Sequence, residues 1–354
     1  MRLNVHLVML VSAALGGGAC AAAAPAGAPA LSAEAPPLKV FVTIPPQAWF
    51  VERIGGPRVA VQVLVGPGQS PHTFDPTPQQ MARLADARIF FRIGWPLEPR
   101  LLERARSINP NLQVIDTREG IALRWMTPAE AEADERAEQA AGHAEHAPEA
   151  AAPDGVRSPA PPGLLKVSGA AASAAPAPGH TGEADPHFWL NPRYARVQAA
   201  TIEKALAAAD PAHAGEFRKN RAALDEDLDK LDARLREALA PLKGRDFFVY
   251  HPAFGYFADA YGLRQVPVEI EGKEPTARQL ARLIDRARAE GVRVIFVQPQ
   301  FSAKSAEAVA TAIGGSVIRL DDLAKDYLAN LADMAEKVRS ALAGEKGAAQ
   351  PQKQ

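Results

Sequence analysis

Residues 39–56 decide the fold and read Lys-Val-Phe-Val-Thr-Ile-Pro-Pro-Gln-Ala-Trp-Phe-Val-Glu-Arg-Ile-Gly-Gly. The run 39–44 is short, apolar and rich in β-branched residues, which predicts a buried strand. The proline pair 45–46 is acceptable at a helix start and the glycine pair 55–56 marks a stop, so a helix follows the strand directly. This strand–helix unit is typical of a parallel sheet covered by helices.

The same unit recurs along the chain, in two blocks. In the first block we predict further strands at 59–65, 88–93 and 113–115, and helices at 76–87 and 96–108. In the second block we predict strands at 246–250, 265–270, 292–297 and 316–320, and helices at 254–261, 276–290, 302–313 and from Asp321 or Asp322 to about Ala343. The sequence therefore predicts an α/β protein of two lobes, each a four-stranded parallel sheet with helices on both faces.

A long helix is predicted between the two blocks, at about 212–240. It carries one apolar stripe with spacings of 4, 3, 4 and 4 residues, formed by Leu224, Leu228, Leu231, Leu235 and Leu239. A helix of about 29 residues is roughly 43 Å long, which is enough to run the height of two stacked domains. We therefore expect a rigid backbone helix that joins the lobes, with the cleft between them as the ligand site.

The sequence divides into a signal, two lobes, the helices that link them and an insert. Arg2, the apolar run 3–15 and the small residues 16–24 have the layout of a secretory signal, which we place at about 1–30. We expect an N-terminal lobe at 38–190, linking helices at 192–242 and a C-terminal lobe at 244–345. Within the first lobe, residues 128–185 are rich in Ala, Pro, Glu and Gly and bury too little apolar surface to fold, so we interpret them as a low-complexity insert.

Cysteine and charge narrow the classes of function. The single cysteine, Cys20, lies in the signal, so the mature chain has no disulfide and no thiolate ligand. Lipoprotein processing sites usually have a larger aliphatic residue three positions before the cysteine, where this chain has Gly17. We therefore favour a soluble periplasmic product over lipid anchoring at Cys20. The 40 basic and 41 acidic residues are nearly balanced, which gives no reason to expect a nucleic-acid partner, and we expect a monomer.

Three of the eight histidines lie in or beside the predicted lobes. His72 and His251 follow predicted strands, one in each lobe, and Asp321 follows a third, which is where open parallel sheets bind ligands. His187 follows no strand and lies at the end of the insert. Each residue alone also fits an ordinary role, a solvated loop histidine or a helix N-cap. Two strand-end histidines, each beside a proline, nevertheless favour a metal site.

The donor types favour zinc. Three neutral imidazoles and one oxygen donor suit four-coordinate Zn²⁺, which has no ligand-field preference and accepts ligands from separate lobes. Nitrogen-rich sites disfavour Mg²⁺ and Ca²⁺, and Mn²⁺ usually needs more carboxylate.

The segments around these residues resemble those of the periplasmic metal-binding proteins of zinc and manganese ABC importers, known as cluster A-I solute-binding proteins. The matching segments, in the family's order, are 68–76 (GQSPHTFDP), 185–192 (DPHFWLNP), 250–256 (YHPAFGY), 297–301 (VQPQF) and 320–324 (LDDLA). The resemblance implies that His72, His187 and His251 are metal ligands and that Asp321 occupies the fourth position. Manganese members carry Glu where this chain has His251, so the resemblance favours zinc.

The resemblance also implies capture of Zn²⁺ and its delivery to an ABC transporter membrane permease, without catalysis. Zinc members often carry a His-rich acidic loop before the second ligand, whereas this insert has only His143, His146 and His180, so it is either a degenerate metal-collecting loop or a spacer. Three rival functions stay open: a zinc hydrolase, a manganese or chelate receptor, and an adhesin. The sequence has no His-Glu-x-x-His motif and no evident general base, which argues against a hydrolase. Trp189, Tyr256 and Glu274 are expected to be core and capping residues rather than supports of the site.

Overall fold

The computed structural model describes residues 36–71, 74–126, 184–268, 281, 284–285, 287–289, 291–301 and 304–344. The predicted signal peptide, His72, Glu274 and the insert histidines lie outside these residues. Both predicted lobes belong to one unit of the fold that starts at Pro37.

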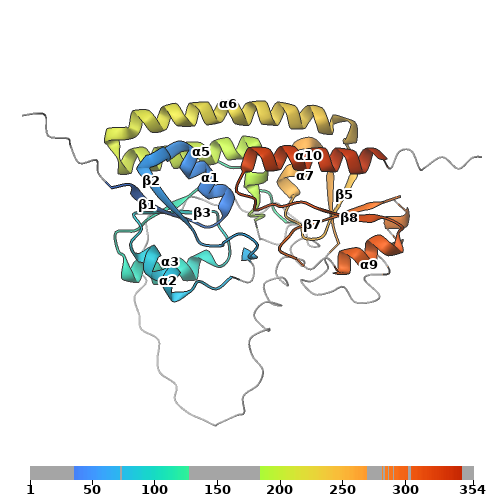
Figure 1. The fold of residues 1–354 in the computed structure, drawn as a ribbon, viewed down its shortest axis with the longest axis horizontal. Helices are drawn as coiled ribbons and strands as arrows, with labels where there is room; N and C mark the ends of the chain where they lie inside the picture. The colour runs from blue at the N-terminus through green and yellow to red at the C-terminus, as the bar shows by residue number, and fades with distance from the viewer. Residues whose placement is uncertain are drawn as a thin grey trace, which may run out of the picture. The chain divides into compact units, whose positions relative to one another are not determined.

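The first lobe is built as expected, with strand and helix alternating (Figure 1). Its elements are β1 Leu38–Val42, α1 Pro45–Gly55, η1 Gly56–Arg58, β2 Val59–Val63, α2 Pro78–Ala85, β3 Ile89–Arg92, α3 Glu98–Ile108 and β4 Gln113–Asp116. The four strands are parallel and lie in the order β2-β1-β3-β4. In the register, Val40 of β1 pairs with Val61 on one side and with Ile89 on the other.

Side-chain alternation along β1 explains why helices cover both faces of this sheet. Val40 and Val42 belong to a core cluster that contains Ile54 of α1. Phe41 points to the opposite face and belongs to a cluster that contains Leu101 of α3. The predicted burial of the sheet on both faces is therefore confirmed.

The second lobe repeats the arrangement. Its elements are β5 Asp246–Val249, α7 Gly255–Tyr261, β6 Arg264–Pro267, β7 Val294–Val297, α9 Lys304–Ala312, β8 Ser316–Arg319 and α10 Tyr327–Gly344. The strands are again parallel, in the order β6-β5-β7-β8, which is the order of the first sheet. Phe247 and Val249 of β5 face one core cluster, and Phe248 faces the other.

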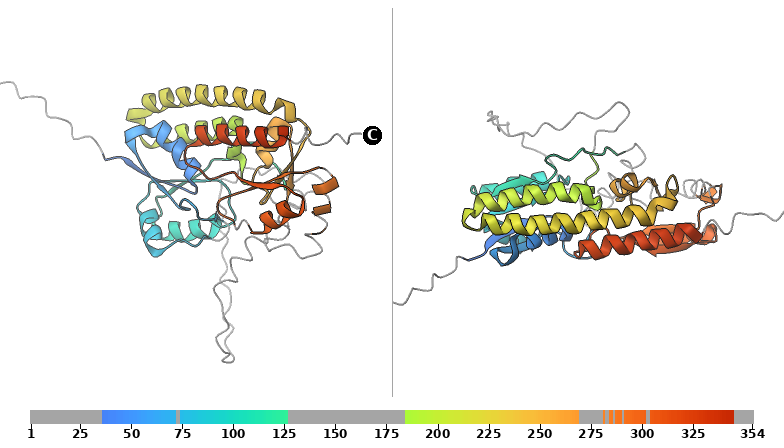
Figure 2. Two further views of the ribbon diagram at one scale, coloured as in Figure 1. Left: turned by 45° about the vertical axis from the view of Figure 1, so that its right-hand side comes forward. Right: turned by 90° about the horizontal axis from the view of Figure 1, so that it is seen from above.

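Helical segments connect the two sheets. They are η3 Phe188–Leu190, α5 Pro192–Ala209, η4 Pro211–His213, α6 Ala214–Leu239 and η5 Ala240–Leu242. With 26 residues, α6 is about 39 Å long, and all five leucines of its predicted stripe are buried. It lies between α5 and α10 (Figure 2) and also packs on α1 and α7, so it contacts both lobes. One cluster of buried residues runs through the linking helices and both lobes. The domain limits 38–190, 192–242 and 244–345 therefore stay a prediction.

The last helix starts later than predicted. We expected Asp321 or Asp322 to begin it, but α10 begins at Tyr327. Asp326 takes the capping role, because its Oδ1 accepts a hydrogen bond from the amide of Ala329 at 3.3 Å. Oδ1 of Asp321 instead accepts the amide of Leu323 at 2.9 Å, which closes a local turn that competes with a helix.

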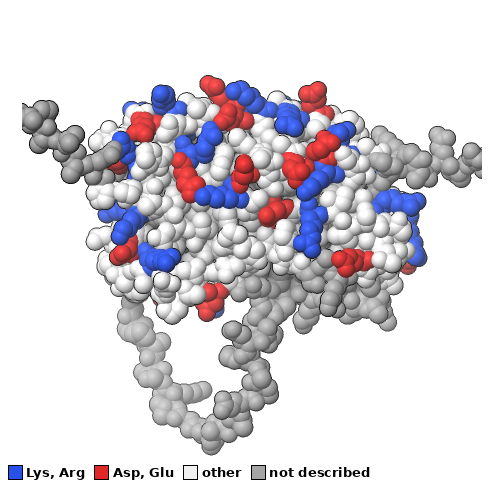
Figure 3. All heavy atoms as spheres, viewed as in Figure 1, with Lys and Arg blue, Asp and Glu red and all other residues white. Residues whose placement is uncertain are grey.

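Charges of both signs are mixed on the described surface that Figure 3 shows. On the face drawn in Figure 3, Lys and Arg alternate with Asp and Glu over the described surface. Among the described helices, none combines the length and the apolar character that a membrane span requires.

Candidate metal-binding site

The shared strand order places a switch point in each lobe. In the first sheet it lies between β1 and β3, and in the second it lies between β5 and β7. Ligands of open parallel sheets bind outside the carboxyl ends of the strands at such a point. His251 comes two residues after β5, and Trp95 comes three residues after β3, so each switch point contributes a ring to the same region.

His251 is held by Gln298, the residue that follows the neighbouring strand β7. Its carbonyl accepts a hydrogen bond from Nε2 of Gln298 at 3.1 Å, and its amide donates to Oε1 of the same side chain at 3.4 Å. Its ring stacks on Phe301 with 4.9 Å between centroids. The imidazole is therefore fixed at the carboxyl edge of the sheet, and it is only 1 % exposed.

His187 is fixed by a carboxylate two residues earlier. Asp185 Oδ1 lies 2.8 Å from Nδ1 of His187 and accepts the amide of His187 at 2.9 Å. A carboxylate at this nitrogen favours the tautomer with the proton on Nδ1, which leaves Nε2 as the metal donor. The ring lies at the indoles of Trp95 and Trp189, at centroid distances of 5.6 Å and 5.3 Å.

The two imidazoles meet although they are 64 residues apart in the sequence. The ring centroids of His187 and His251 are 5.6 Å apart, with the planes at 73°. Burial holds the pKa of His251 well below its usual value, the neighbouring His187 lowers it further, and Asp185 acts in the opposite direction. His251 is therefore a neutral imidazole at neutral pH, the form that binds metal.

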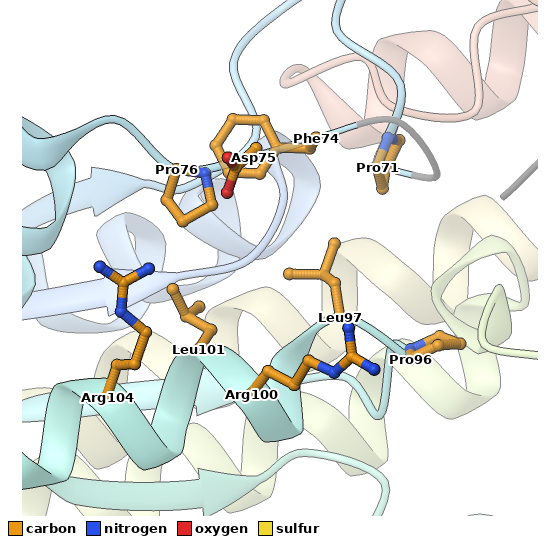
Figure 4. A pocket seen from close by; sticks show the side chains of 9 residues that line it. All are labelled: Pro71, Phe74, Asp75, Pro76, Pro96, Leu97, Arg100, Leu101 and Arg104. Atoms are coloured by element: carbon orange, nitrogen blue, oxygen red, sulfur yellow. The ribbon is translucent and has the colours of Figure 1, made fainter. Parts of the chain in front are cut away.

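Described residues on either side of His72 in the sequence line a pocket. His72 itself lies outside the described residues, but Pro71 and residues 74–76 line a pocket of about 610 Å³ that α3 borders on the other side (Figure 4). Leu97 and Leu101 form part of its wall, and Arg100 and Arg104 also line it. The pocket belongs to the first lobe alone.

The predicted oxygen ligand, Asp321, is followed by a second carboxylate, Asp322, which we did not predict as a ligand. Asp321 is half-buried, and its Oδ1 accepts the amide of Leu323 and, at 3.2 Å, Nε2 of Gln300. Asp322 is buried, and among the described residues its Oδ1 has no hydrogen-bond partner. Burial raises the pKa of Asp322 to about 7, while His187 lowers it and Asp321 raises it. Local sequence pattern alone does not show which of the two carboxylates is buried, because they are adjacent and come two and three residues after β8.

Trp189 and Tyr256, which we expected to be core or capping residues, are both buried. Trp189 is buried and donates from Nε1 to the carbonyl of Asp322 at 2.9 Å, and its own carbonyl accepts the hydroxyl of Tyr327 at 2.6 Å. Tyr256 is also buried, and burial raises its pKa well above the usual value. In the described part of the chain, which excludes His72, no three His, Cys, Asp or Glu side chains form a group that could hold a metal. The full ligand set stays a prediction.

Known proteins with similar sequences are components of zinc-uptake systems. The family described as zinc-uptake complex component A, periplasmic, matches residues 40–341. The high-affinity zinc uptake system protein ZnuA of Brucella abortus is 36% identical over 141 residues, which is 39% of this chain and 41% of that protein. The ZnuA protein of Bacillus subtilis is 26% identical over 289 residues, covering 81% of this chain and 78% of that protein.

Solved structures agree. A crystal structure of ZnuA superposes with a TM-score of 0.68 at 35% identity, covering 86% of this chain and 99% of that one. The periplasmic zinc-binding protein TroA of Treponema pallidum has a TM-score of 0.65 at 21% identity, which shows the shared fold alone. The matched family is a transport component rather than an enzyme, as we expected. The chain belongs to the family of periplasmic A components of zinc-uptake complexes.

Proposed function

We propose that this protein captures Zn²⁺ in the cleft between its lobes and delivers it to the membrane permease of an ABC importer. One observation carries the proposal: two buried imidazoles from different parts of the fold lie with ring centroids 5.6 Å apart. One of them is oriented by a buried carboxylate, the arrangement typical of a metal-binding histidine.

The proposed ligands are His72, His187, His251 and Asp321. Neutral imidazoles are strong donors for zinc, and burial keeps His251 neutral. One of the similar structures, at 35% identity, is a ZnuA deletion mutant with zinc bound, which supports the same cargo here.

Two further parts of the proposal follow from the family. A component of an uptake complex needs a permease partner, and a periplasmic component needs export, for which residues 1–30 have a suitable pattern. We also propose that the protein acts as a monomer, and that it has no nucleic-acid partner, in keeping with its balanced charge.

The test is competitive zinc binding by the chelator-stripped protein and its His251→Ala variant. Zinc-finger peptides bind Zn²⁺ with about 10–16 kcal/mol, so one of four ligands contributes about 3 kcal/mol, or about a hundredfold in Kd. We expect one tight zinc per chain and a loss of about that size in the variant. His213→Ala is the matched control, because His213 pairs with Asp210 at 2.6 Å at the start of α6 and should leave affinity unchanged. Equal affinity in all three proteins would refute the proposed site.

Manganese is the second candidate cargo, since a manganese-bound periplasmic protein shares the fold with a TM-score of 0.62 at 18% identity. Competition between the two ions separates the candidates. We expect Mn²⁺ not to displace Zn²⁺, because it lies at the weak end of the divalent series and a site with three imidazoles has little carboxylate. Displacement at similar concentrations would favour the manganese receptor.

A further inference from the structure

Arg124 lies where the described stretch that ends at residue 126 meets the one that begins at residue 184. Its neighbour Trp125 forms an isolated antiparallel bridge with Ala184. The carbonyl of Arg124 accepts the amide of Asp185 at 2.9 Å. The backbone of Arg124 is therefore joined to the residue that orients His187.

The side chain of Arg124 connects the same aspartate to the other lobe. Its Nη1 lies 3.2 Å from Oδ2 of Asp185, and its Nε lies 3.1 Å from Oδ2 of Asp259 in α7. Its amide donates to the hydroxyl of Tyr256, also in α7, at 2.7 Å. Asp185 is fully buried whereas the Asp259 side chain is 64% exposed, so the guanidinium links the interior to the surface of α7.

A glycine makes this path possible. Gly255 is the first residue of α7, and a Cβ added there would lie 2.5 Å from Cζ of Arg124. A cation at a helix N-terminus is disfavoured by the helix dipole, so the helix end itself does not attract the guanidinium. The two carboxylates and the space left by Gly255 hold it there.

We propose that Arg124 is a positioning residue that ties the Asp185–His187 pair to helix α7 of the second lobe, so that metal affinity and release depend on the placement of α7. This inference rests on the proposed metal-binding function. The Asp185 carboxylate uses Oδ1 for His187 and Oδ2 for Arg124, so a displacement of α7 reaches the imidazole through one rigid group. Removing an outer partner of a metal-binding histidine typically weakens metal affinity by about 10–100-fold.

A hollow beside this link offers a matched control. It has a volume of about 340 Å³, and Arg124, Arg193, Tyr256 and Asp259 are among the residues that line it. Arg193 is also an arginine at this surface, but its Nε pairs with Asp232 of α6 at 3.1 Å. Arg193→Gln therefore removes a comparable ion pair that does not include Asp185.

The experiment compares Arg124→Gln, Asp259→Asn, Arg193→Gln and the parent protein. We expect Arg124→Gln to weaken zinc binding by about tenfold and to speed zinc release by a similar factor. Asp259→Asn, which frees only the α7 end, should give a smaller change in the same direction. Arg193→Gln should stay within about twofold of the parent. Thermal unfolding of each variant shows whether the comparison is made between folded proteins.

A second readout needs no metal. Nitrogen NMR of the His187 ring in the metal-free protein reports the tautomer, and Arg124→Gln should reduce the population protonated on Nδ1, because the carboxylate loses its anchor. Gly255→Ala provides a second variant for this readout, because the added methyl group displaces the Arg124 guanidinium without removing its charge. It should shift the His187 tautomer in the same direction as Arg124→Gln. Unchanged zinc affinity, release rate and tautomer in Arg124→Gln would overturn the inference while parent zinc binding leaves the proposed function standing. A parent protein that binds no zinc refutes the proposed function itself.

Discussion

Asp185→Asn isolates the chemistry of the proposed site without changing the shape of the side chain. The carboxylate accepts from His187 Nδ1 at 2.8 Å, from the His187 amide at 2.9 Å and from Arg124 Nη1 at 3.2 Å. An amide keeps one acceptor oxygen but places an NH₂ group opposite either the imidazole or the guanidinium, where donor would face donor. The variant therefore loses at least one charge-assisted hydrogen bond.

The magnitude follows from these contacts. Hydrogen bonds to charged groups contribute about 1.5–3 kcal/mol and neutral ones about 0.5–1.5 kcal/mol, so the exchange costs about 1–2 kcal/mol in the orientation of His187. That corresponds to a rise of about 5- to 30-fold in the Kd for zinc, which lies within the range observed for outer partners of metal ligands.

The assay is competition with a chromophoric chelator at neutral pH. The chain offers a matched control in Asp210→Asn, because Asp210 Oδ2 lies 2.6 Å from Nδ1 of His213 in a second, partly exposed Asp–His pair. We expect Asp185→Asn to weaken zinc binding and Asp210→Asn to leave it unchanged. A Kd for Asp185→Asn within twofold of the parent, in a protein with an unchanged melting temperature, would refute the orienting role of Asp185.

Three further predictions concern the core, acid stability and the oxygen ligand. Leu228→Ala in the buried stripe of α6 should lower the free energy of unfolding by about 2–5 kcal/mol in urea, whereas Ile108→Ala, at a residue that is 59% exposed, should change it by less than about 0.5 kcal/mol. Burial raises the pKa of Asp116, but the hydrogen bond and charge of Arg118 outweigh it and the net pKa is lowered. Stability from Asp116 is therefore present above the unfolded pKa of about 3.9 and lost as pH falls through the folded pKa; Asp116→Asn should flatten this part of a stability–pH profile, and an unchanged slope would contradict the assignment. Asp321→Asn should weaken zinc binding more than Asp322→Asn, and the reverse order would transfer the ligand role to Asp322.

Local patterns in the sequence were sufficient for the elements and the general place of the site. Short apolar runs predicted all eight strands of the described residues, and the leucine spacing predicted the buried face of α6. The start of α10 was missed, because Asp321, Asp322 and Asp326 all have the chemistry of an N-cap and only the hydrogen bond from Ala329 to Asp326 distinguishes them.

The position of His251 after a strand was enough to select it, whereas His187 follows no strand and was selected by the resemblance of its segment. Neither signal contains the distance between them. Their approach depends on strand order and on packing of both lobes against α6, which are interactions between residues far apart in the chain.

Short-range patterns in the sequence identify the strand–helix units, the buried stripe of the long helix and the histidines that follow strands, because each of these is set by residues within one or two turns of one another. Only the tertiary structure decided that His187 meets His251, that Asp322 is more buried than Asp321, and that Arg124 joins Asp185 to Asp259. Arg124 is 61 residues from the first of these aspartates and 135 from the second, and such pairings arise from the packing of whole elements, which a local pattern does not specify.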